Sequence, residues 1–186
     1  MSAFLFAFAA VALTSLGSRD QLLVAHLAGR LGKTLGLLAT GLLVSVLTAG
    51  LMAWAGSTIS AMLPPAAKSM LVAIALVVAG VELAWPRQMR LAAEPTRSLG
   101  AIGLVLFGYQ ITDAARFLVF ALAAGFAFPP LAGAGGALGG AAALVLGWVA
   151  GDQLAGWPLR AVRIALGALL LLTGLFIGLS VRGLIY

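Results

Sequence analysis

Four ionisable residues interrupt two otherwise apolar segments of this sequence, namely Arg19 and Asp20 in the first segment and Asp113 and Arg116 in the second. A charged group in the middle of a bilayer costs roughly 2.5–3.5 kcal/mol on insertion scales, and groups that persist there line ion or proton pathways. We therefore expect all four side chains to face the protein interior. With their polar neighbours they give the candidate transport or ion site: Ser15, Ser18, Arg19, Asp20, Gln21, Gln110, Thr112, Asp113 and Arg116.

The spacing of these residues predicts how they meet. On a continuous helix Ser15, Arg19 and His26 lie along one face. Asp113 and Arg116 stand three residues apart on another helix, close enough to pair. Arg19 and Asp20 point about 100° apart, so we expect one of them to reach across to the segment that carries Asp113.

The amino-acid composition indicates what class of protein carries these groups. Of the 186 residues, 63% are hydrophobic and 9% are charged, with a mean hydropathy of +1.16. Soluble domains carry roughly 25% charged residues, so the composition predicts an integral membrane protein whose main partner is the lipid bilayer. The net charge of +6 then reflects topology signals and headgroup anchors, and we expect no nucleic-acid partner.

Several chemistries have no residues to support them. The chain has no cysteine and one histidine, which excludes disulfides, thiolate sites and multi-histidine metal or haem sites within one chain. It also lacks a Ser/His/Asp grouping and a nucleotide fingerprint. We therefore expect no enzyme activity and no cofactor, with a divalent cation or a proton as candidate substrate.

Charge, proline and glycine divide the chain into six long apolar segments, too long and uniformly apolar for the strands of a membrane barrel. The sequence thus predicts a single all-α transmembrane domain over residues 1–186. Seven of the 24 glycines lie in the fifth segment, where small residues allow close helix packing. The segments are about Ala3–Ala28, Thr34–Gly56, Ala67–Trp85, Leu99–Ala124, Leu131–Leu154 and Leu159–Val181.

Basic residues gather in alternate turns. The turns after the first, third and fifth segments carry the excess that marks cytoplasmic loops, so both termini should lie outside the cytoplasm, in a bacterial inner membrane. The opposite side holds only Lys68 and Arg182. The basic residues of the first group are Arg30, Lys33, Arg87, Arg90, Arg97, Arg160 and Arg163.

A shift of 95 positions aligns the sequence weakly with itself. The stretch from Ser15 to Ser18 falls on Gln110 to Asp113, and Lys68 falls on Arg163. Two halves of three crossings each, about residues 1–92 and 93–186, must have opposite orientations because three is odd. The pattern is typical of the inverted repeats of secondary transporters, whose substrate sites lie near mid-membrane.

With these motifs the chain resembles the transmembrane protein 165 family of manganese or calcium/proton exchangers, within the lysine-exporter superfamily. The family motif is Glu-x-Gly-Asp-Lys/Arg-Ser/Thr, usually then Gln, once in each half. The first copy here runs from Ser15 to Gln21 and keeps Gly17, Arg19 and Gln21; the second keeps only Asp113. The resemblance implies cation/proton exchange, with Asp20 and Asp113 as metal ligands or proton carriers.

The charges in this sequence differ from the family pattern. The motif brings a surplus of about two negative charges, which suits a divalent cation, whereas Asp20 and Asp113 are balanced by Arg19 and Arg116. Three interpretations stay open: a transporter of this family with altered substrate or coupling, an exporter of another small polar solute, and a non-transporting structural or regulatory membrane protein. Association of several copies is compatible with each.

Glu82 is a further acidic residue within an apolar segment. Glu82 lies near the end of the third apolar segment, beside Trp85. At the edge of a bilayer such a side chain can extend to the headgroups, so we interpret Glu82 as an interfacial acid rather than as a proton relay.

Overall fold

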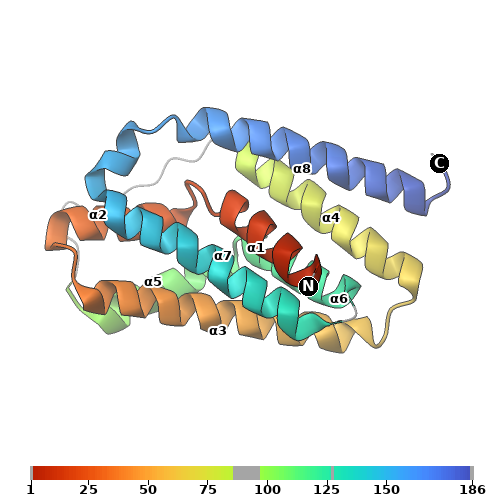
Figure 1. Ribbon diagram of the computed structural model, residues 1–186, viewed down its shortest axis with the longest axis horizontal. Helices are drawn as coiled ribbons and strands as arrows, with labels where there is room; N and C mark the ends of the chain where they lie inside the picture. Colours follow the sequence, from red (N-terminus) through yellow and green to blue (C-terminus); the bar gives the residue numbers. More distant parts are fainter. Residues whose placement is uncertain (1, 86–96, 127, 185–186) are drawn as a thin grey trace.

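The computed structural model describes residues 2–85, 97–126 and 128–184, and in these ranges it consists of helices joined by turns, without strands (Figure 1). Arg87 and Arg90, two of the predicted topology signals, lie outside the described residues. The helices are α1 (Ser2–Thr14), α2 (Arg19–Leu31), α3 (Leu35–Ser60), α4 (Pro65–Ala84), α5 (Leu99–Ile111), α6 (Ala114–Gly125), α7 (Pro129–Ala150), the 3-10 helix η1 (Gly151–Gly156) and α8 (Leu159–Val181).

Four helical stretches are each long and apolar enough to cross a membrane: α3, α4, α7 continued into η1, and α8. Two pairs of shorter helices reach the same length only together. α1 and α2 are bent by 61° relative to each other, and α5 and α6 by 58°. The described part of the chain therefore contains four membrane-spanning candidates, or six if each bent pair is one crossing.

The backbone leaves the helical conformation at both bends. Between α1 and α2, Gly17 adopts a left-handed backbone with φ of +67°, which residues with a side chain rarely adopt, and the Ser18 hydroxyl then caps α2 by accepting the Gln21 N–H. Between α5 and α6, Asp113 is extended and precedes the first residue of α6. The single continuous helix expected for each segment is thus wrong, and Ser15 does not share a helix with Arg19.

The glycine-rich α7 runs through the middle of the bundle and contacts α1, α2, α3 and α6. A Cβ atom at Gly135 would lie 2.3 Å from the Phe4 carbonyl oxygen, and one at Gly139 would lie 2.6 Å from that of Phe8. Only glycine permits this approach of α1 to α7, so the predicted packing role of these glycines agrees with the structure.

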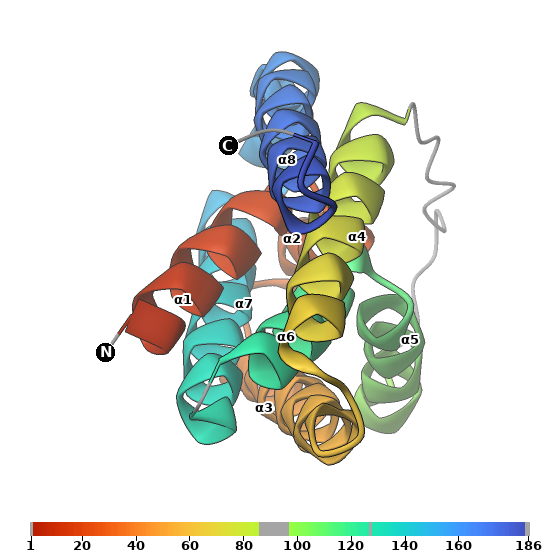
Figure 2. The same cartoon turned by 90° about the vertical axis from the view of Figure 1, so that its right-hand side faces the viewer.

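The remaining helices pack on the neighbours of α7, with α5 on α3 and α4 on α6. α8 packs along α4 on one side, and α6 lies between α4 and α3 (Figure 2). The turn from α3 to α4, the end of α6 and the C-terminus lie toward the right-hand end in Figure 1, whereas η1 and the turn from α2 to α3 lie toward the left. The two bends meet inside this bundle and bring the predicted polar residues together.

Candidate functional site

Asp20 lies in the first turn of α2 and is 5% exposed. Its Oδ1 accepts a short hydrogen bond from the Ser18 hydroxyl, and its Oδ2 accepts one from Gln110 Nε2 at 3.0 Å. Ser18 caps the same helix, so the bend of the first pair also orients the carboxylate. Asp20 therefore connects the first half of the chain to the last turn of α5.

The side chain of Gln110 links the two bends by hydrogen bonds. Its side chain is 1% exposed, and its Oε1 accepts hydrogen bonds from Thr48 Oγ1 at 2.8 Å and from Arg116 Nη2 at 3.1 Å. Because its Nε2 donates to Asp20, the neutral amide stands between a carboxylate and a guanidinium group. It joins opposite charges that are not in direct contact.

Arg116, on α6, is 2% exposed and is held by α3 and by Gln110. Its Nε donates to Thr48 Oγ1 and its Nη2 to Ser45 Oγ, each at 2.9 Å. All the hydrogen bonds recorded for this guanidinium go to neutral oxygens, and within the described residues no ion pair joins it to Asp113. The predicted pairing at three-residue spacing is wrong because the interhelical contacts with α3 draw the side chain away.

Gly140 on α7 leaves the space that this guanidinium occupies. A Cβ atom there would lie 2.7 Å from Arg116 Nη2 and 2.8 Å from Ser45 Oγ. Ser45 also donates to the carbonyl oxygen of Ala137 at 3.2 Å. The small residues of α7 thus serve the polar network as well as the packing of helix against helix.

Arg19 approaches the second bend from the other side of α2. Its Nη2 donates to Thr112 Oγ1 at 3.3 Å, and its guanidinium carbon lies 5.2 Å from the centre of the Tyr109 ring, within the range of a cation–π contact. Both Arg19 and Asp20, rather than one of them, therefore reach the α5–α6 segment.

Two of the predicted site residues, Gln21 and Ser15, lie outside the network that joins Asp20, Gln110 and Arg116. Gln21 is fully buried, accepts the Gly17 N–H at 2.6 Å and donates to the Ala143 carbonyl at 2.8 Å. It therefore fixes the first bend to α7. Ser15 is buried at the end of α1, but among the described residues its side chain takes no part in the network around Asp20.

Glu82 joins the site, contrary to our interpretation of it as an interfacial acid. Its Oε2 accepts the N–H of Ala114 at 2.6 Å, which caps the N-terminus of α6. Its carboxyl group also faces that of Asp113, the residue before Ala114. The sequence did contain a signal, because Glu82 is the one acidic residue of the third apolar segment.

Adding Glu82 changes the charge of the site. The expected balance of Asp20 and Asp113 against Arg19 and Arg116 becomes three carboxylates and two guanidinium groups, a formal sum of −1 when all are ionised. These groups nevertheless do not form a metal cage, since no cluster of three or more His, Cys, Asp or Glu with metal-binding geometry occurs among the described residues. Of the two predicted metal ligands, Asp20 is bound by Ser18 and Gln110, and Asp113 faces Glu82.

The site gathers carboxyl groups, guanidinium groups and neutral hydrogen-bonding groups at the junction of the two bent helix pairs. Its carboxylates supply acceptor oxygens, its arginines supply fixed donors, and Ser18, Thr48 and Gln110 supply neutral groups of either kind. Comparisons of the chain with protein-family models, with curated proteins and with solved structures find no match.

Proposed function

We propose that this protein is a six-span secondary transporter built from two three-span halves of opposite orientation, with its site where the two bent helix pairs meet. The observation that carries the proposal is the network from Asp20 through Gln110 to Arg116, which joins the two bends inside an apolar bundle. Broken helices that present polar groups at mid-membrane are the usual construction of substrate sites in such transporters.

The bounds of the helices support the repeat. α2 begins at Arg19 and α6 at Ala114, 95 residues apart, which is the offset found in the sequence. α3 and α7 begin 94 residues apart, and so do α4 and α8. Two pairs of contacts are reciprocal as well, because α1 packs on α7 as α5 packs on α3, and α2 packs on α7 as α6 packs on α3. The packing of α4 on α6 has no comparable counterpart between α8 and α2.

The residues of the site support proton coupling. Glu82 and Asp113 approach each other at the N-terminus of α6, and carboxyl groups inside a helix bundle are the usual proton carriers of transporters. Asp20 lies on the other half of the chain, linked to the same α5–α6 segment. We propose that protonation of these carboxyl groups alternates with the binding of a small cation or polar solute.

We propose a substrate different from that of the manganese or calcium/proton exchangers that the chain resembles. The resemblance favours cation/proton exchange, but the site has two arginines and lacks the motif carboxylates at Ser15, Ser18 and Gln110. Divalent cations are bound by several carboxylate and carbonyl oxygens. We therefore propose a monovalent cation or a zwitterionic solute as the substrate, exported across a bacterial inner membrane with both termini outside the cytoplasm.

A second candidate function is structural. Every hydrogen bond recorded for Arg116 goes to another residue of the protein, which is also the arrangement of a guanidinium group that only holds helices together. In that case the protein is a non-transporting membrane protein, and neutralising the carboxylates changes stability without changing any flux.

Reconstitution in proteoliposomes with a pH-sensitive dye inside separates the two candidates. Na⁺, K⁺, Mn²⁺, Ca²⁺ and a zwitterionic amino acid are added in turn outside. We expect one of the monovalent or zwitterionic solutes to drive proton movement, and Asp20→Asn to abolish it. Asp152→Asn is the matched control, because Asp152 is exposed in η1. Proton movement that survives in a folded Asp20→Asn variant, or the lack of any solute-driven flux, contradicts the transport proposal.

A further inference from the structure

A polar cavity of about 460 Å³ lies where α3 ends, α4 begins, α6 ends and α7 begins. Lys68 on α4 is half-buried in its wall. Among the described residues the Lys68 ammonium group has no hydrogen-bond or ion-pair partner. The cavity thus offers the Lys68 cation to an anion, whereas the hydroxyl groups of Ser57, Ser60 and Ser69 already donate to backbone carbonyl oxygens. Its lining includes Ser57, Ser60, Lys68, Ser69, Phe126 and Pro129.

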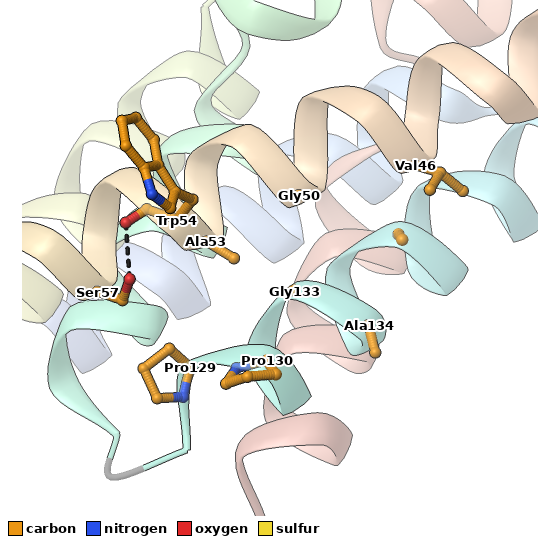
Figure 3. Close-up of a pocket in the computed structure, with 10 residues that line it drawn as sticks. Val46, Gly50, Ala53, Trp54, Ser57, Pro129, Pro130, Gly133 and Ala134 are labelled. Carbon is orange, nitrogen blue, oxygen red and sulfur yellow. Dashed lines mark hydrogen bonds between the residues drawn. The ribbon is translucent and has the colours of Figure 1, made fainter.

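An apolar groove of about 460 Å³ lies between α3 and α7 (Figure 3). Its wall shares Ser57 and Pro129 with the polar cavity, so the two are adjacent. The groove follows α3 from Ser57 through Gly50 to Val46. Eleven residues of helix correspond to about 16 Å, a length suited to an extended hydrocarbon chain. The wall contains no charged side chain.

A second apolar groove, of about 430 Å³, is also adjacent to the polar cavity. It shares Ser69, Gly125 and Phe126 with the polar cavity and is lined by side chains of α1, α4, α6 and α8, among them Phe6 and Ile177. The polar cavity therefore stands between two apolar grooves, each on the surface of helices that are apolar enough to lie in lipid.

We infer that these three adjacent cavities form a binding site for one anionic diacyl phospholipid, with its phosphate beside Lys68 and one acyl chain in each groove. The distribution of charge supports this occupant. Lys68 and Arg182 are the basic residues on the side of the membrane opposite to the predicted cytoplasmic turns, so Lys68 is not accounted for by the topology rule. A free phosphate ion would use the polar cavity but neither of the grooves.

The inference is tested on the purified, delipidated full chain in detergent by native mass spectrometry. The probes are dioleoyl phosphatidylglycerol, dioleoyl phosphatidylcholine and inorganic phosphate. One lysine contributes about 1 kcal/mol to the binding of an anionic lipid, which corresponds to about fivefold in affinity. We expect the wild type to bind one phosphatidylglycerol with about fivefold preference over phosphatidylcholine, and Lys68→Gln to lose that preference.

A second variant tests the groove independently of charge. Gly50→Leu places a side chain in the α3–α7 groove, and a Cβ atom at Gly50 meets no other atom within 4 Å, so the helix packing is preserved. We expect this variant to weaken the binding of both lipids. Gly108→Leu is the matched control, because Gly108 is equally open but lies on α5, away from these cavities.

Arg182→Gln is the charge control, since Arg182 is exposed beyond the end of α8. We expect it to retain the preference of the wild type. An unchanged lipid preference in Lys68→Gln, an equal loss in Arg182→Gln, or equal weakening by Gly50→Leu and Gly108→Leu would each overturn the inference. So would displacement of phosphatidylglycerol by equimolar inorganic phosphate, because that result indicates a simple anion site.

Discussion

Replacing Gln110 by leucine removes the amide that joins Asp20 to Arg116 while keeping a side chain of similar size. Three hydrogen bonds are lost: from Gln110 Nε2 to Asp20 at 3.0 Å, and to Gln110 Oε1 from Thr48 at 2.8 Å and Arg116 at 3.1 Å. The carboxylate keeps its bond from Ser18, and the guanidinium keeps its bonds to Ser45 and Thr48. Each charged group therefore loses part, but not all, of its solvation.

The magnitude follows from these contacts. Interhelical hydrogen bonds in membrane proteins average about 0.6 kcal/mol, which gives about 2 kcal/mol for three. Depriving a buried charged group of a partner costs more, about 1–3 kcal/mol. We therefore expect Gln110→Leu to lower the free energy of unfolding by about 2–4 kcal/mol, measured by circular dichroism during reversible unfolding in mixed SDS micelles.

The control is Gln153→Leu, because Gln153 is exposed in η1 and substitutions at such positions usually change stability by less than about 0.5 kcal/mol. A double-mutant cycle with Arg116→Met separates the shared contact from the loss of each side chain. We expect a coupling energy of about 0.5–3 kcal/mol. If Gln110→Leu is as stable as the control, or if the two substitutions are additive, the argument that this amide connects the two halves is refuted.

Two further predictions concern topology and metal binding. Because the chain has no natural cysteine, Ser2→Cys and Gly183→Cys can each be labelled in whole cells; we expect an impermeant thiol reagent to reach both, whereas protection of both contradicts the predicted orientation. Calorimetry on the purified wild type should show weak or no binding of Mn²⁺ and Ca²⁺, since hydrogen bonds already occupy both oxygens of Asp20. The combined Ser15→Glu, Ser18→Asp and Gln110→Glu variant should bind these ions more tightly, and micromolar binding by the wild type refutes this reasoning.

The sequence alone determined that the chain is all-helical and where its apolar segments lie. Long apolar runs suit a bilayer, in which the backbone must satisfy its own hydrogen bonds, and these segments are helical in the described parts of the chain. The sequence also identified where two of these segments are interrupted, because charged residues in an apolar run are costly. Asp20, Gln110 and Arg116, chosen on that ground, lie in one network.

Only the tertiary structure decided which of these residues meet. The bends depend on the left-handed Gly17 and on the cap that Glu82, distant in sequence, provides for α6. The hydrogen-bond partners of Arg116 come from α3 and from Gln110. Helical spacing within its own segment had predicted a different partner, Asp113. Periodicity describes neighbours along a single helix, whereas a buried charge takes the partners that the packing of other helices brings to it.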